Sequence, residues 1–259
     1  MTYSLLMPGW FFNRLVPLFG GVLRNEPEVL LETHVPKPGR IKHHYTISGI
    51  VIILFIEVNL ALLNHYQGKL SQYARVIAES ISMLSIEIVV HALTYIVACS
   101  FVNSENGFRL PVMGILSDAE NFQFFKFDET ELPHFALGSF DDGRDTLNIS
   151  RDSYSGYDVQ TAVLQFRQIC ESLYCIFLLA YQHGVTANWK QSVVESEHQV
   201  NESSISDWKN AVDLADKALD QAKTAFAQHL QGLPESQDTA KVAIQHLAER
   251  YDIAHSLIY

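Results

Sequence analysis

The feature that most constrains this chain is an apolar run from Ile50 to Val58, interrupted by one charged residue. β-Branched and aromatic residues dominate the run, which is typical of a strand buried on both faces. Tyr45 lies in a similarly extended segment just before it, and Ser48-Gly49 between the two segments is turn chemistry. The sequence therefore predicts a β-hairpin over Arg40–Asn59, with its second strand in the centre of a sheet.

The charge that interrupts this run is Glu57. A carboxylate near the end of a central strand is costly to bury unless a metal ion, a cation or several hydrogen bonds meet it. Glu57 is therefore the first candidate for a functional residue.

The tripeptide Glu57-Val58-Asn59 and the preceding strand resemble the core of the PD-(D/E)XK nuclease superfamily. In that family an acidic residue on one strand faces an acidic-X-Lys tripeptide on the next. Here Glu57 matches the acidic position, Asn59 stands where the lysine is expected, and His44 or its neighbour His43 takes the first acidic position. The resemblance implies a restriction-endonuclease-like fold in which two of the three chemical groups are replaced.

Other segments extend this expectation. A first helix is predicted within Gly9–Leu23, and a first strand over Val29–Val35. Helical spacing then runs through Gln67–Ser85 and Ile86–Cys99. Some members of the resembled family carry the catalytic cation on this helix, which makes Lys69 a further candidate beside the alternative of a plain amphipathic helix.

Two later segments, Leu110–Leu116 and Phe122–Phe127, read as strands joined by a turn. They resemble the later strands of fungal members of the superfamily, including nuclease-like domains of crinkler-type effectors, where they complete the sheet. Leu132–Tyr157 is rich in Gly, Asp and Ser and is predicted to be a loop. A strong apolar helix is predicted over Val159–His183.

The C-terminal part of the sequence differs in composition from the segments before it. After Gly184 the sequence is polar to Ser206, which predicts a linker. An αα-hairpin follows, with one helix to about Leu230 and another from Ser236 to the end. Its largest apolar group, Trp208, is expected to be substantially buried.

The sequence as a whole thus predicts an α+β (α/β) fold, with a central mixed sheet flanked by helices and a C-terminal αα-hairpin. The predicted organisation is a nuclease-like core over 1–184, a polar linker over 185–206 and a helical hairpin over 207–259.

The net charge of the chain limits the kinds of partner that it can bind. The formal net charge is −11, and residues 131–259 carry nine Lys/Arg against eighteen Asp/Glu. Nucleic-acid binding by an acidic protein needs a local basic patch. The candidate is the predicted turn with Lys37, Arg40 and Lys42, for which simple solvated charges are the alternative.

Compartment signals are sparse. The three cysteines, Cys99, Cys170 and Cys175, lie in apolar segments and lack zinc-site spacing, which predicts buried thiols in a reducing compartment. The apolar N-terminus, Met1–Gly21, has no basic region in front of it, and Arg14 interrupts it, which argues against a signal peptide; a leader is the alternative, chiefly if the protein is an effector. We expect an intracellular protein, cytoplasmic or nuclear, with no membrane span, or one delivered into a host cell if it is an effector.

Three functions follow from these residues. The favoured hypothesis is a degenerate nuclease-like domain that contacts a protein or a nucleic acid. The alternative is an active DNA or RNA endonuclease that holds Mg²⁺ or Mn²⁺ through Glu57 and His44, the imidazole suiting softer ions than Mg²⁺. A structural or assembly protein unrelated to nucleases is the third. The oligomeric state is left open.

Overall fold

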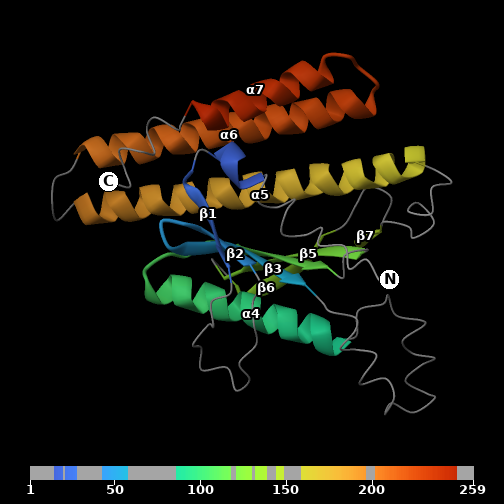
Figure 1. Cartoon of the computed structure of the whole chain (residues 1–259). Coiled ribbons are helices and arrows are strands. Elements are labelled where there is room, and N and C mark those ends of the chain that lie inside the picture. Colours follow the sequence, from blue (N-terminus) through green and yellow to red (C-terminus); the bar gives the residue numbers. More distant parts are fainter. Residues whose placement is uncertain are drawn as a thin grey trace, which may run out of the picture.

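The computed structural model describes residues 15–19, 21–27, 43–57, 86–117, 121–129, 132–138, 144–148, 159–196 and 202–249. These residues form an α+β fold in which helices cover both faces of a mixed seven-stranded sheet (Figure 1). The strands are β1 (Leu23–Pro27), β2 (His43–Ile47), β3 (Ile50–Glu57), β4 (Val112–Ser117), β5 (Asn121–Asp128), β6 (His134–Leu137) and β7 (Thr146–Asn148). The helices are the short 3₁₀ helix η1 (Val16–Phe19), α4 (Ile86–Glu105), α5 (Val159–Ser196), α6 (Glu202–Leu230) and α7 (Ser236–Ala248).

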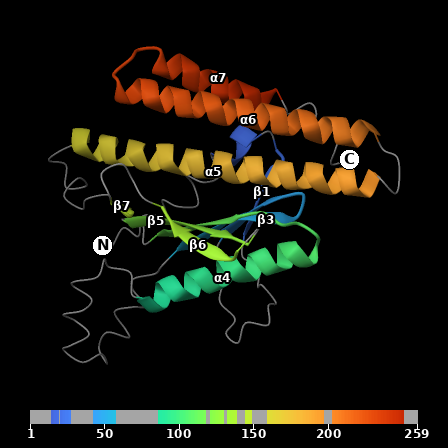
Figure 2. The same ribbon diagram turned by 180° about the vertical axis from the view of Figure 1, so that it is seen from behind.

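The sheet has the strand order β1-β2-β3-β4-β5-β6, and β7 also pairs with β5. Strands β3 and β4 are parallel and every other described pair is antiparallel. A parallel pair needs a long crossover, and α4 lies within that connection, on one face of the sheet. Figure 2 shows α5 on the opposite face, with α6 and α7 stacked beyond it.

The predicted hairpin is confirmed. Strands β2 and β3 pair antiparallel around Ser48-Gly49, whose φ angles are 51° and 82°. Two successive positive φ angles are typical of the tight turn whose twist matches that of the flanking strands, and glycine accepts this conformation without strain. The apolar run of β3 is buried from Ile50 to Phe55, as a central strand requires.

One face of the sheet is closed by α4. Its residues Ala92, Tyr95, Ile96 and Cys99 join a small core with side chains from β3, β4 and β5. Gly114 of β4 makes the close approach possible, because a Cβ there would lie 2.2 Å from Cδ1 of Ile96.

The other face carries the larger core, which α5 shares with the sheet and with α6. Phe177 of α5 packs edge-on against Tyr45 of β2, with ring centroids 4.7 Å apart. Trp208 of α6 is 7% exposed and belongs to the same core, which confirms its predicted burial. The predicted αα-hairpin is also confirmed, as α6 and α7.

The linker prediction is wrong over much of its length. Helix α5 continues through Gly184 to Ser196, and α6 already begins at Glu202. Gly184 is a point of close packing instead of a helix end, because a Cβ there would lie 2.8 Å from Cδ1 of Ile47. Of the polar residues that follow on this long helix, Asn188 is buried and Lys190 is exposed.

The helix expected within Gly9–Leu23 is described only in part: Leu15 is helical, η1 follows it, and positive-φ Gly21 precedes β1, while residues 9–14 and 20 lie outside the described residues. Two further expectations differ from the structure. The predicted loop Leu132–Tyr157 contains β6 and β7, which are short strands formed by pairing with β5. The second helical segment extends past Cys99 to Glu105.

Two predicted elements, the strand Val29–Val35 and the helical segment Gln67–Ser85, lie outside the described residues. The described strand that pairs with the outer side of β2 is β1.

Among the described residues, Val163–Val194 of α5 is the stretch whose length and apolar composition would allow it to cross a membrane. The same helix lies between the sheet and α6 (Figure 1) and contributes to the core shared by both. One side of α5 thus packs into the core, and 28% of its apolar window is buried.

Candidate functional site

The candidate residue His44 lies on β2, where it hydrogen-bonds to a carboxylate on the neighbouring strand. Its Nε2 is 3.2 Å from Oε2 of Glu26 on β1. The hydroxyl of Thr46 donates to the other oxygen of Glu26 at 3.0 Å. The antiparallel register explains this, because Glu26 stands directly opposite His44 and Thr46 is two residues further on the same face.

This small polar group is largely withdrawn from water on the β2 side. His44 is 8% exposed and Thr46 is 2% exposed, whereas the side chain of Glu26 is 44% exposed. Buried polar groups are costly unless paired, and Glu26 supplies the partner for both. The arrangement accounts for a histidine at this position without a bound ion.

Strand pairing also fixes the backbone position of Glu57. His44 stands opposite Leu54, and Glu57 lies three residues further along β3, opposite Ser117 of β4. At the rise of a β-strand this is about 10 Å along the strand. The side chain of Glu57 lies outside the described part of the chain, as do Asn59, Lys69 and the predicted basic patch of Lys37, Arg40 and Lys42.

The described donor atoms near His44 do not form a magnesium site. Mg²⁺ prefers oxygen ligands in octahedral geometry, whereas this group offers one carboxylate and one imidazole. No cluster of three or more His, Cys, Asp or Glu suited to a metal occurs within the described ranges. A metal site at the hairpin would have to draw on Glu57 or on other side chains outside those ranges.

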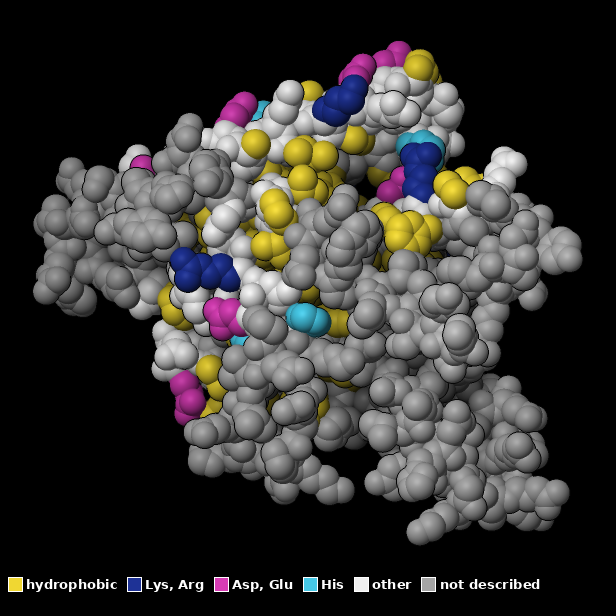
Figure 3. Space-filling view, viewed as in Figure 1, with side chains coloured by type: hydrophobic (Ala, Val, Ile, Leu, Met, Phe, Trp, Pro, Cys, Tyr) yellow, Lys and Arg dark blue, Asp and Glu magenta, His cyan; other side chains and the backbone are white. Residues whose placement is uncertain are grey.

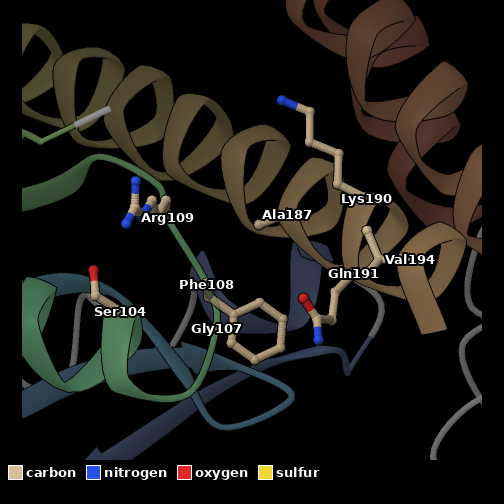
Figure 4. Close-up of a pocket in the computed structure, with 8 residues that line it drawn as sticks. All are labelled: Ser104, Gly107, Phe108, Arg109, Ala187, Lys190, Gln191 and Val194. Atoms are coloured by element: carbon tan, nitrogen blue, oxygen red, sulfur yellow. The ribbon is translucent and has the colours of Figure 1, made fainter. Parts of the chain in front are cut away.

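A second region was not predicted from the sequence. A cleft of about 500 Å³ opens between the end of α4, the segment that follows it, and the C-terminal half of α5. Its lining includes Ser104, Phe108, Arg109, Lys190 and Gln191 (Figure 4). Figure 4 shows Arg109 and Lys190 on two different walls, one on the segment after α4 and the other on α5.

The cleft has an ordered wall. Gly107 has φ of 86° and ends α4, and its backbone lies against the amide of Gln191. The Ser104 hydroxyl donates to the carboxylate of Glu129. Phe108 is half-buried and packs on the main core. Within the described chain neither Arg109 nor Lys190 has an ion-pair partner.

Charges beside the cleft act on His183, which precedes Ala187 of the lining by one turn of α5. Burial lowers the pKa of His183, and the positive charges of Lys126 and Lys190 lower it further, against an opposing effect of Asp128. Lys126 and Asp128 form an ion pair of 3.0 Å on β5. The lowered pKa favours the neutral form of His183, and its buried Nδ1 has no hydrogen-bond partner among the described residues.

No sequence pattern could have revealed this cleft. Its two cations come from segments far apart in the chain, and only the packing of α5 across the sheet brings them to one opening. Lys190 also lay within the residues predicted to be a linker.

The expectation of three buried thiols is met in full only by Cys99. Cys99 is buried, and burial raises its pKa to about 12. Cys170 is half-buried, with a pKa raised to about 11 by burial and by Glu171. Cys175 is exposed, so the expectation of three buried thiols is wrong for this residue.

Hydrophobic side chains are also visible over the helical layer in Figure 3. Exposed apolar residues occur at the start of α5 (Val163, Leu164) and near the end of α6 (Phe226, Leu230). A contact of 3.3 Å between Arg167 and His229 joins these two helix ends.

Comparisons of the chain with protein-family models, with curated proteins and with solved structures give no match.

Proposed function

We propose that this chain is a restriction-endonuclease-like domain whose nuclease site is degenerate and which acts by contact with a macromolecular partner. The observation that carries the proposal is the state of His44, which stands where the resembled family has its first acidic group. Its imidazole is buried and paired with Glu26. A residue engaged in this way stabilises the pairing of β1 and β2 and contributes no acidic metal ligand.

The order of elements supports the fold part of the proposal. An antiparallel hairpin ends in the strand with the acidic residue, a helix follows, and later strands join the same sheet. This is the order that the resemblance implies. The strand parallel to β3 is β4, which the intervening α4 places next to it.

Charge favours a protein over a nucleic acid as the partner. The chain carries a formal net charge of −11, and nucleic-acid binding depends on neutralising phosphates. Exposed apolar side chains at the ends of α5 and α6 add surface of the kind found in protein contacts.

An active metal-dependent endonuclease is the second candidate, and one observation favours it. Glu26 brings a carboxylate beside His44 from β1, whereas the resembled family carries its additional acidic residue on the first helix. Glu57 lies three residues from Leu54, the register partner of His44, so the position of this second carboxylate is on the opposite face of the sheet. The lysine that helps to activate water is still replaced by Asn59.

Cleavage assays separate the two candidates. The unmodified protein is incubated with single-stranded DNA, double-stranded DNA and RNA, in Mg²⁺ and in Mn²⁺, beside Glu57→Ala and Glu26→Ala variants. We expect no cleavage above that of the variants in any condition. Cleavage by the unmodified protein that both variants lose would establish the active endonuclease.

A further inference from the structure

The structure assigns a binding site to the cleft between α4 and α5, and we propose that this site takes the phosphate monoester group of a small organic ligand. The proposal is independent of the hairpin and of the nuclease-like function. It rests on the size of the cleft and on the two cations in its walls.

The size suits a small molecule. Sites for small ligands typically enclose roughly 300–1,000 Å³, and this cleft has about 500 Å³. Its lining mixes the ring of Phe108 with the polar groups of Ser104 and Gln191. A few polar groups on an otherwise apolar wall are the usual composition of such sites.

The two cations have no ion-pair partner among the residues that the structure describes. Most of the described ion pairs elsewhere join residues that are near in sequence, such as Arg167 with Glu171 and Lys241 with Asp238. Arg109 and Lys190 have no such partner within the described chain, although the protein as a whole is strongly acidic. A guanidinium and an ammonium on two walls match a doubly charged phosphate, which accepts charge-assisted hydrogen bonds from both.

Two described carboxylates in this region have hydrogen-bond or ion-pair partners. Glu129 accepts the hydroxyl of Ser104, and Asp128 is paired with Lys126. The field at His183 is set more by Lys126 than by Asp128, with Lys190 adding to it. Glu129 keeps its negative charge beside Ser104, so the attraction for a phosphate comes from the charges of Arg109 and Lys190 themselves.

The organic part of the ligand would lie toward Phe108 and Gln191. Phe108 is anchored in the core and offers an apolar surface at the cleft, and the amide of Gln191 is held close to Gly107. A flat ring would gain from contact with the aromatic side chain, whereas an aliphatic alcohol phosphate would gain less.

Calorimetric titration of the full chain tests the proposal with three probes: a nucleoside monophosphate, glycerol phosphate and inorganic phosphate. We expect at least one of the two phosphate monoesters to bind more tightly than inorganic phosphate, and their order distinguishes a ring-bearing ligand from an aliphatic one. Arg109→Gln and Lys190→Gln should each raise the Kd about tenfold. Both residues are exposed, so the substitutions leave the core intact.

Lys223→Gln is the matched control, because Lys223 is an exposed cation on α6 and does not line the cleft. Its Kd should equal that of the unmodified protein. The proposal is overturned if neither monoester binds at millimolar concentration, if neither binds more tightly than inorganic phosphate, if Arg109→Gln and Lys190→Gln leave the Kd unchanged, or if Lys223→Gln weakens binding as much as they do.

Discussion

The two faces of the sheet differ in how their polar groups are used. On the face covered by α4, Asn103 of that helix bonds both backbone groups of Val51, and Glu26 meets both His44 and Thr46. On the face covered by α5, the main core is thick and apolar, but its margin opens into a cleft where Arg109 and Lys190 have no described ion-pair partner.

This difference distinguishes polar residues that stabilise the fold from polar residues that can bind a ligand. A buried polar group that is fully paired stabilises the fold and has little capacity left for a ligand. An exposed cation in a cleft lowers the stability of the fold very little when no anion is bound, because water solvates it. His44, the candidate predicted from the sequence, is a paired structural residue. Arg109 and Lys190 in the cleft are exposed cations that can bind a ligand.

The largest expected effect concerns the core on the α5 face. Phe177→Ala should lower the free energy of unfolding by about 4 kcal/mol, because it removes a fully buried ring from contact with Tyr45 and Phe19. Urea unfolding followed by circular dichroism measures it. The matched control is Phe101→Ala on α4, where the ring is 55% exposed and the loss should stay below about 1 kcal/mol. Equal losses would mean that α5 does not carry the main core.

The α4 face is tested by Asn103→Ala. Its amide donates to the Val51 carbonyl at 2.7 Å and accepts from the Val51 N–H at 3.0 Å, just where β3 extends beyond its pairing with β4. We expect a loss of about 3 kcal/mol, because both backbone groups would be buried without partners. Asn106→Ala, at an exposed bond to the carbonyl of Val102, should cost less than about 1 kcal/mol. A loss of stability in Asn103→Ala no greater than in this control would show that the two hydrogen bonds to Val51 do not stabilise the α4 face.

A smaller loss of stability is expected when the contact between β1 and β2 is removed. Glu26→Ala should lower the free energy of unfolding by about 1–2 kcal/mol, because it leaves His44 and Thr46 without their carboxylate. Arg24→Ala, an exposed change on the same strand, should be nearly neutral. In a double-mutant cycle with His44→Ala, a coupling energy near zero would show that the contact contributes nothing.

The smallest perturbation is chemical labelling of the three cysteines, which compares their reactivity in the folded protein. The thiolate is the form that reacts, and burial raises the pKa of Cys99 on the α4 face to about 12, so it stays protonated at pH 8. Burial and Glu171 raise the pKa of Cys175 as well, so exposure sets the order: a thiol reagent should label exposed Cys175 first and Cys170 more slowly, and should reach Cys99 only in urea. Rapid labelling of all three cysteines in the native protein would contradict the closed packing of α4.

The hairpin was predictable because its signals are local. The run from Ile50 to Phe55 can be stable only in the centre of a sheet, and Ser48-Gly49 selects the turn. The same holds for the burial of Trp208, which follows from the size of its side chain. These features depend on neighbouring residues and on simple burial.

Other features depend on tertiary contacts that a local pattern cannot show. Gly184 resembles a helix end in the sequence, yet it is the place where α5 comes closest to Ile47. Strands β6 and β7 exist because β5 offers them an edge. The partnership of His44 with Glu26 required the register of β1, and the cleft required α5 to pass beside the end of α4.

The central claim is that the hairpin does not hold a catalytic metal ion, and Mn²⁺ titration of isotopically labelled protein tests it most directly. Paramagnetic Mn²⁺ broadens the amide signals of residues near a bound ion. Our account predicts that signals from 43–57 keep their intensity at Mn²⁺ concentrations that support nuclease activity in metal-dependent enzymes, in the unmodified protein and in Glu57→Ala alike. Selective broadening of these signals that disappears in Glu57→Ala would contradict the account and place a metal site at the hairpin.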